Sequence, residues 1–136
     1  MIDGANAEVC DMSESKIPVL PHYHAQHEPI LLQSMPALDT VRMVAEAMKQ
    51  LGDPSRLRIF WLLCHCEECV INIAAATEMS SPAVSHHLRL LKRSGLIVSR
   101  RSGKEMYYRA ADTPIAEKLH HTIEELAMIS CPESEH

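Results

Sequence analysis

Aromatic residues and long apolar runs are both scarce in this sequence. Only 4% of the 136 residues are aromatic, whereas 46% are hydrophobic and 23% are charged. This balance is typical of a soluble, helix-rich protein and argues against disorder along the whole chain. No run of about 18 apolar residues occurs, so we expect no transmembrane helix and no membrane partner. The acidic start of the chain does not have the basic-then-apolar pattern of a signal peptide, so we expect a cytoplasmic protein.

Internal repeats, low-complexity tracts and an excess of basic residues are absent as well. The length suits one compact domain of ordinary size, which excludes a large enzyme built of several lobes. Thirteen Lys and Arg against 18 Asp and Glu give a formal net charge of −5. Such a net charge by itself disfavours nucleic acid as a partner.

The charge is distributed unevenly along the chain. Residues 80–111 carry seven basic residues and one acidic residue, a net charge of +6. By contrast, residues 1–39 and 112–136 each carry −5, and residues 40–79 carry −1. A basic block of this density predicts a surface for a polyanion, with a solvated charged face as the alternative.

Helical periodicity begins near residue 36. We expect a flexible arm over residues 1–35, a folded domain over 36–131 and a tail over 132–136. Apolar spacing and caps predict five helices. The first three run over about 37–51, from Asp53-Pro54 to the Cys64 region, and over 70–77. The fourth runs from a cap at Ser81-Pro82 to about residue 94, and the last begins near residue 113. Two β-prone runs, 97–101 and 105–109, flank Ser102-Gly103-Lys104 and predict a hairpin. The expected fold is mainly α with a β-hairpin wing, in the order ααααββα.

The short helix and the helix starting at Ser81 are joined by a tight polar turn, which suits a helix-turn-helix. Ser and His side chains reach base edges in the major groove, and basic side chains hold phosphates. The basic hairpin that follows completes a winged helix. We therefore predict double-stranded DNA as a partner, with these candidate contacts: Ser81, Ser85, His86, Arg89, Lys92, Arg100, Arg101 and Lys104.

Three of the five cysteines lie within six residues, as Cys64-x-Cys66-x-x-Cys69. Thiols stay reduced in the cytosol, so clustered cysteines favour metal or redox chemistry over a disulfide. Thiolates are soft ligands, and three of them suit Zn²⁺, Cd²⁺, Pb²⁺ or As(III). Small buried hydrophobic residues are the alternative, which the polar neighbours His65, Glu67 and Glu68 disfavour.

Three segments carry a resemblance to a known family: residues 51–57 (LGDPSRL), 84–88 (VSHHL) and 103–108 (GKEMYY). They resemble the ArsR/SmtB winged-helix metalloregulators, and the similarity covers about residues 38–130. The resemblance implies a homodimer paired through the first and last helices, a two-fold symmetric operator and repression that an inducer relieves. It also places Ser81, Ser85 and His86 where the recognition helix of the family meets bases. Dimerisation has independent support, because one such unit reads few base pairs.

The resemblance also implies two kinds of metal site. The first uses thiolates at the start of the third helix, sometimes with ligands from an N-terminal arm. Here Cys69 matches the family position, Ile71 stands where the second family cysteine would be, and Cys10 is the candidate ligand of the arm. Cys64 and Cys66 lie upstream of the family positions, so the predicted set of Cys64, Cys66, Cys69 and Cys10 is a rearranged form of that site. His22, His24 and His27 form another candidate group in the arm.

The second family site lies on the last helix, between subunits. Asp112 matches its first position, and either His121 with Glu125 or His120 with Glu124 could replace its other ligands. A solvated helix face is the alternative. Cys131 is a candidate accessory ligand, or else a thiol outside the site.

These patterns together predict a metal-responsive transcriptional repressor. It would bind operator DNA as a homodimer and be released when Cd²⁺, Pb²⁺, Zn²⁺ or As(III) binds the cysteine cluster. We do not expect an enzyme, because no phosphate loop or nucleophile triad is present. The alternatives are a repressor of the same fold that senses thiol oxidation or persulfides, a thiol enzyme, and a metal-buffering protein without DNA.

Overall fold

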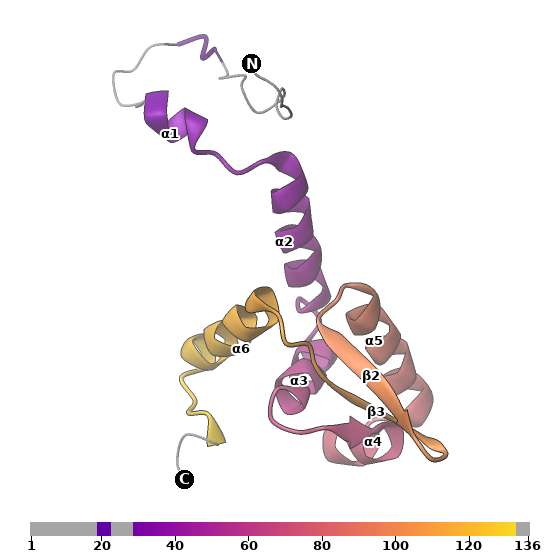
Figure 1. Ribbon diagram of the computed structural model, residues 1–136. Coiled ribbons are helices and arrows are strands. Elements are labelled where there is room, and N and C mark those ends of the chain that lie inside the picture. The colour runs from indigo at the N-terminus through magenta and orange to yellow at the C-terminus, as the bar shows by residue number, and fades with distance from the viewer. Residues whose placement is uncertain (1–18, 23–28, 133–136) are drawn as a thin grey trace. The chain divides into compact units, whose positions relative to one another are not determined.

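The computed structural model describes residues 19–22 and 29–132. Its elements are α1 (Pro29–Gln33), α2 (Leu38–Gln50), α3 (Pro54–Leu63), β1 (Glu68–Cys69), α4 (Val70–Thr77), α5 (Ser81–Arg93), β2 (Ile97–Ser102), β3 (Glu105–Ala110) and α6 (Pro114–Ala127) (Figure 1). The chain divides into two compact units, Met1–Arg42 and Met43–His136, and the boundary falls inside α2.

The first unit contains α1 and the beginning of α2. The sequence pattern predicted no helix before residue 36, and α1 corrects that expectation. Pro29 at its first position fits a helix start, because the missing N–H would have no intrahelical partner there. Cys10, His24 and His27 lie outside the described residues, and the boundaries of the arm and the tail stay predictions.

The helices of the second unit begin at polar caps. Asp53 accepts a hydrogen bond from a backbone N–H at 3.0 Å before α3, and Thr113 accepts one at 3.3 Å before α6. At α5 the cap is Ser80, whose Oγ accepts at 3.2 Å, so the expected cap at Ser81 was wrong by one residue. Each cap satisfies a donor that the first helical turn leaves without a partner.

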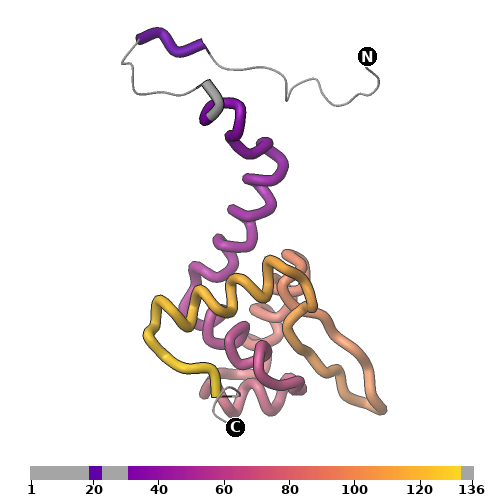
Figure 2. The backbone as a smooth tube through the Cα atoms, turned by 60° about the vertical axis from the view of Figure 1, so that its left-hand side comes forward, coloured from indigo at the N-terminus to yellow at the C-terminus, as the bar shows by residue number. Residues whose placement is uncertain are grey.

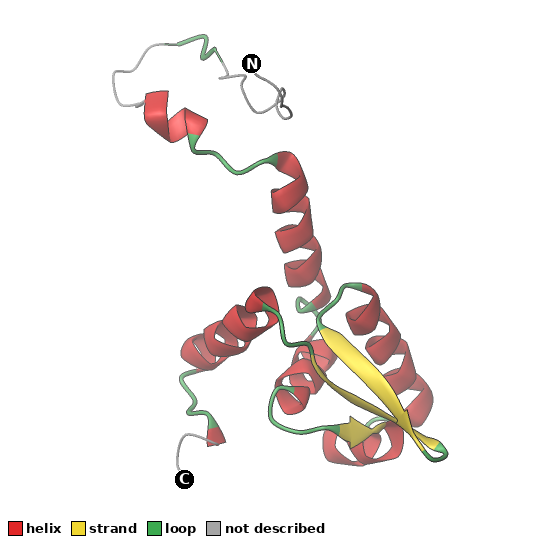
Figure 3. Cartoon of the chain, in the orientation of Figure 1, coloured by secondary structure: helices red, strands yellow, loops and turns green. Residues whose placement is uncertain are grey.

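The strands β2 and β3 form the predicted hairpin, which extends away from the helices of its unit (Figure 2). Its two-residue turn contains Gly103 at a φ of 64°, a conformation that residues with side chains rarely adopt. Strand β1, which the sequence pattern did not predict, pairs antiparallel with β3 through Glu68 and Cys69 (Figure 3). The sheet therefore has the order β1-β3-β2. A strand of two residues is too short to show a periodic pattern in the sequence.

The core of the second unit lies between α3, α4, α5 and the base of the hairpin. Helix α5 packs into this core through Val84, Leu88 and Leu91, which are at most 1% exposed. The largest fully buried side chains are Phe60, Ile59, Ile73, Leu88, Leu91, Leu96, Ile97 and Val84. Full burial of each large side chain contributes about 1.5–3 kcal/mol, which fixes α5 firmly against the domain.

Other apolar side chains stay exposed within the single chain. On α2 these are Leu38, Val41, Met43, Val44 and Met48, and around the end of α6 they are Leu126, Met128 and Ile129. Much of the apolar surface of α2 therefore remains uncovered. None of the helices in the described part of the chain is long and apolar enough to cross a membrane.

Candidate nucleic-acid interface and metal-ligand groups

Helices α4 and α5 form a helix-turn-helix through residues 78–80. Glu78 ends α4 in the left-handed conformation, with a φ of 57°. The N–H groups of Glu78 and Met79 donate back to carbonyls of the last turn of α4. This pattern closes a helix end and turns the chain sharply, which sets α5 across α4.

One face of α5 is polar and exposed, opposite the buried apolar residues. All five predicted contacts on this helix are exposed: Ser81, Ser85, His86, Arg89 and Lys92. Small polar side chains occupy the first turns and basic side chains the later ones. This order fits a helix whose N-terminal residues approach bases while its later residues approach phosphates.

His87 lies on α5 but contacts the protein interior. Its Nδ1 atom is 3.3 Å from the guanidinium of Arg56, which also donates to the carbonyl of Gln50 at 2.8 Å. Burial lowers the pKa of His87, with the Asp53 carboxylate acting in the opposite direction. A neutral imidazole accepts the Arg56 hydrogen bond, so these contacts join the end of α2 to α5.

The wing presents Arg101 and Lys104 as exposed cations near its tip. Arg100 instead donates two hydrogen bonds to Glu67, at 2.7 and 2.8 Å, and lies 5.2 Å from the ring centre of Tyr107. These hydrogen bonds lower the pKa of Glu67. A phosphate bound by Arg100 would therefore share the guanidinium with Glu67.

The clustered cysteines occupy the connection between α3 and α4. Cys64 directly follows α3 and is half-buried, Cys66 is exposed, and Cys69 is buried in β1. Cys64 and Cys66 line a groove of about 650 Å³. Among the described residues, the three sulfur atoms do not form a compact ligand group. The cysteine site, with Cys10 outside the described range, stays a prediction.

The residues of the predicted last-helix site do not converge within one chain. Asp112 precedes α6 and lies 3.3 Å from the Arg109 guanidinium. His121 is exposed and lies 4.0 Å from Glu117, and Glu125 is also exposed. A site that these residues share between two subunits stays a prediction.

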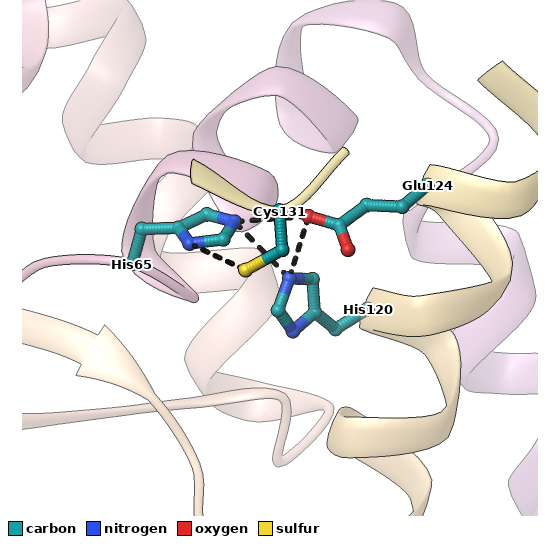
Figure 4. Close-up of side chains that lie close together, drawn as sticks. All are labelled: His65, His120, Glu124 and Cys131. Atoms are coloured by element: carbon teal, nitrogen blue, oxygen red, sulfur yellow. Dashed lines mark hydrogen bonds and ion pairs between the residues drawn. The ribbon is translucent and has the colours of Figure 1, made fainter. Parts of the chain in front are cut away.

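Four other side chains do converge, between the end of α3 and α6 (Figure 4). His65, His120, Glu124 and Cys131 each offer one potential ligand atom, and these atoms lie within 4.8 Å of one another. From the sequence, His120 and Glu124 were expected only as an alternative pair and Cys131 only as an accessory ligand. His65 was not predicted as a ligand, although a histidine between two cysteines is itself a signal.

Close polar contacts connect this group. The Nε2 atoms of His65 and His120 are 3.1 Å apart, and they lie 3.1 and 3.0 Å from Oε2 of Glu124. The sulfur of Cys131 lies 3.6 Å from Nδ1 of His65. The indole N–H of Trp61 donates to the same Glu124 oxygen at 3.0 Å.

Opposing effects act on the pKa of the buried Glu124 carboxyl. Burial disfavours its charged form, but the hydrogen bonds from His120, Trp61 and His65 outweigh that effect. The pKa of Glu124 therefore lies below its ordinary value. The group thus brings a carboxyl group, two imidazoles and a thiol together.

A helix-turn-helix with an exposed basic helix and an adjacent hairpin defines a winged helix-turn-helix protein. Residues 53–99 match the family described as bacterial regulatory protein, arsR family. The chain is 34% identical over 111 residues to the transcriptional repressor SmtB homologue of Synechocystis sp., covering 82% of this chain and 84% of that protein. It belongs to the ArsR/SmtB family of transcriptional regulators.

Two further relatives agree with this assignment. The cadmium resistance transcriptional regulatory protein CadC homologue of Staphylococcus aureus is 41% identical over 70 residues, which cover 51% of this chain and 58% of that protein. The homodimeric winged helix-turn-helix DNA-binding domain from Mycobacterium bovis is 35% identical, with a TM-score of 0.62. That match covers 70% of this chain and 87% of the other. The fold and family expected from the sequence are confirmed.

Proposed function

We propose that this regulator is a metal-responsive repressor that binds operator DNA as a homodimer in the cytoplasm. A thiophilic ion (Cd²⁺, Pb²⁺, Zn²⁺ or As(III)) binds Cys64, Cys66 and Cys69, with Cys10 as a further ligand, and releases the DNA. The names of the relatives support this, because one is a repressor and another a cadmium resistance regulator. The proposed activity is binding and release, without catalysis.

The observation that carries the proposal is the strand β1. It contains Cys69 and pairs with β3 of the wing, and the residue before it, Glu67, holds Arg100 of β2. An ion that draws the three sulfur atoms together must move this connection, because they do not lie together in the described structure. The wing is hydrogen-bonded to the connection, so it would move as well.

The coupling between ion and DNA is reciprocal. If the ion weakens the operator complex by some factor, the operator must weaken ion binding by the same factor. Couplings of this kind are typically about 5–150-fold. The groove beside Cys64 and Cys66 gives an ion access to the two thiols.

The homodimer has its own support. Helix α2 and the end of α6 each expose apolar side chains that a second copy could cover. Burial of apolar surface is the main favourable term in such association. A solved relative is described as homodimeric, which fits this pairing.

The direct test is an anaerobic binding titration on an operator selected from a random duplex library. We expect at least one of the four ions to weaken binding by about 5–150-fold, the range of typical allosteric couplings. The double variant Cys64→Ser/Cys66→Ser should keep the affinity of the metal-free protein and lose the response. Ile71→Ala, an exposed change on α4, should respond like the unchanged protein.

A protein whose operator affinity none of these ions changes would contradict the metal proposal. Release by an oxidant or a persulfide donor alone would instead identify the same fold as a thiol-sensing repressor.

A further inference from the structure

We propose that His65, His120, Glu124 and Cys131 form a second metal site, contained within one chain, that binds Zn²⁺ or a similar borderline ion such as Co²⁺. The ion would tie α6 to the end of α3. This site goes beyond the proposed function, because it shares no ligand with the cysteine cluster and does not require DNA.

The spacing of the four ligand atoms is close to that of a metal site. In tetrahedral zinc sites the bonds are about 2.0–2.3 Å, so neighbouring ligand atoms lie about 3.3–3.8 Å apart. Nε2 of His65, Nε2 of His120 and Oε2 of Glu124 lie 3.0–3.1 Å apart, and every pair of ligand atoms, the Cys131 sulfur included, lies within 4.8 Å. Closing the group around an ion therefore needs movements of only about 1 Å.

The local fold explains why distant residues meet. His120 and Glu124 are four residues apart on α6 and therefore share one face. Met128 then ends α6 with a left-handed φ of 59°, and the N–H of Ile129 donates to the carbonyl of Glu124 at 3.0 Å. This reversal brings Cys131 back beside the helix, where His65 approaches from the turn after α3 (Figure 4).

Burial makes a cation a suitable partner for this group. The side chains of His65, His120 and Glu124 are only 9%, 12% and 8% exposed. Two Nε2 atoms and one carboxylate oxygen face one another at 3.0–3.1 Å. One proton bridges a single pair of these atoms, whereas one metal ion contacts all three. A divalent ion, a carboxylate, a thiolate and two neutral imidazoles also sum to zero charge, which lowers the cost of burial.

Trp61 supplies the outer contact that metal sites commonly have. Its N–H holds the Glu124 carboxylate, and its ring centre lies 4.4 Å from that of His65. Such partners orient ligands and raise metal affinity. Trp61 is also the one tryptophan of the chain, so its fluorescence reports on this site directly.

The donor set favours a borderline ion over the softest ones. Two imidazoles, one carboxylate and one thiolate match the ligands that Zn²⁺ takes in proteins, whereas several thiolates together suit Cd²⁺ or As(III). The two proposed sites are therefore expected to prefer different ions. His120 also lines the groove described above, which offers an entry path.

The test uses the full chain with Cys10, Cys64 and Cys66 changed to Ser and Cys69 changed to Ala, which leaves Cys131 as the sole thiol. We expect this variant to bind one Co²⁺ per protomer under anaerobic conditions. Binding should produce tetrahedral Co²⁺ absorption, a sulfur-to-cobalt charge-transfer band and quenching of the Trp61 fluorescence. Zn²⁺ should displace the Co²⁺.

Two further changes identify the ligands. Cys131→Ser should remove the charge-transfer band. His120→Gln should weaken Co²⁺ binding by more than about tenfold, because even the loss of a residue that only orients a ligand costs about 10–100-fold in metal affinity. Glu117→Gln is the matched control on the same helix, because the Glu117 side chain is 74% exposed and outside the group. Circular dichroism confirms that each variant is folded.

The proposal is overturned if Co²⁺ does not bind stoichiometrically. It is also overturned if neither Cys131→Ser nor His120→Gln changes the binding. In either case the group is a buried hydrogen-bond network. If the variant lacking four cysteines does not fold, the charge-transfer band of the unmodified chain with and without Cys131→Ser decides. The two proposals fail separately, since operator release depends on Cys64 and Cys66 and this site does not.

Discussion

At the scale of single residues, polar caps decide where the helices of the second unit begin. Asp53 shows this clearly, because its carboxylate accepts the backbone N–H of Arg56 while the Arg56 side chain reaches α2 and α5. The same segment therefore starts α3 and fixes it to its neighbours. This gives a physical reason for an Asp-Pro pair at the corner, beyond its resemblance to a family motif.

The cap at Asp53 predicts both a stability loss and a pH dependence. Asp53→Ala should lower the free energy of unfolding by about 1 kcal/mol, whereas Asp53→Asn keeps an acceptor and should cost much less. The hydrogen bond from the Arg56 N–H lowers the pKa of Asp53 in the folded protein. The stabilisation is therefore present above the ordinary pKa of an aspartate and lost as the pH falls through the lower folded value.

Urea unfolding at one protein concentration measures the free energy of unfolding of each variant, at neutral pH and below about pH 4. The acid loss of stability should be smaller in Asp53→Asn than in the unchanged protein. Asp39→Asn, on an almost fully exposed side chain, should leave the profile unchanged. Equal acid profiles for Asp53→Asn and the unchanged protein would contradict the role of this carboxylate.

At the scale of elements, α5 and the hairpin concentrate the basic residues on exposed surface. Arg89 and Arg101 are exposed, whereas Arg100 is shared with Glu67. Phosphate contacts release counterions, so the number of such contacts is measurable from salt dependence. The two kinds of arginine are thus distinguishable by experiment.

The double variant Arg89→Ala/Arg101→Ala should bind operator DNA more weakly and with a shallower salt dependence. Each lost phosphate contact reduces the slope of log affinity against log salt by about 0.9, so we expect a total change of about 2. Arg58→Ala, an exposed basic residue on α3, is the control. Fluorescence anisotropy over a range of salt concentrations measures the operator affinity and its salt dependence for both variants. An unchanged slope in the double variant would remove these residues from the proposed interface.

At the scale of the whole molecule, the chain leaves apolar surface that it does not cover itself. The side chains of Val41 and Met48 are 43% and 58% exposed on α2. A monomer with this much exposed apolar surface on two helices is typical of a protein that associates. The proposed homodimer also supplies the second reading head that a symmetric operator needs.

Changing Val41 and Met48 to Glu should shift the protein towards the monomer and weaken operator binding. Two carboxylates in an apolar interface would lose water without gaining partners. Sedimentation velocity at several concentrations measures the association. Ile71→Glu, at a position that is 66% exposed on α4, should leave it unchanged. If the double variant remains a dimer, the interface does not lie on this part of α2.

Local sequence patterns were sufficient to predict the winged helix-turn-helix fold. Helical periodicity predicted α2 to α6 to within a few residues, because each apolar face repeats along a continuous segment. The segment charges located the basic surface in the same way. A resemblance in the DNA-reading half gave the family, which the relatives confirm.

Contacts between distant residues required the tertiary structure. Strand β1 exists only because β3 lies beside it, and the pair Glu67 and Arg100 joins residues 33 apart. His65 meets Glu124 across 59 residues, and Cys131 joins them because the chain reverses at Met128 after α6. A periodic pattern records which side of an element is buried, but not which side chains of other elements lie opposite. The sequence by itself thus determined helices α2 to α6, the hairpin and their charge, and only the fold decided which ligand atoms meet.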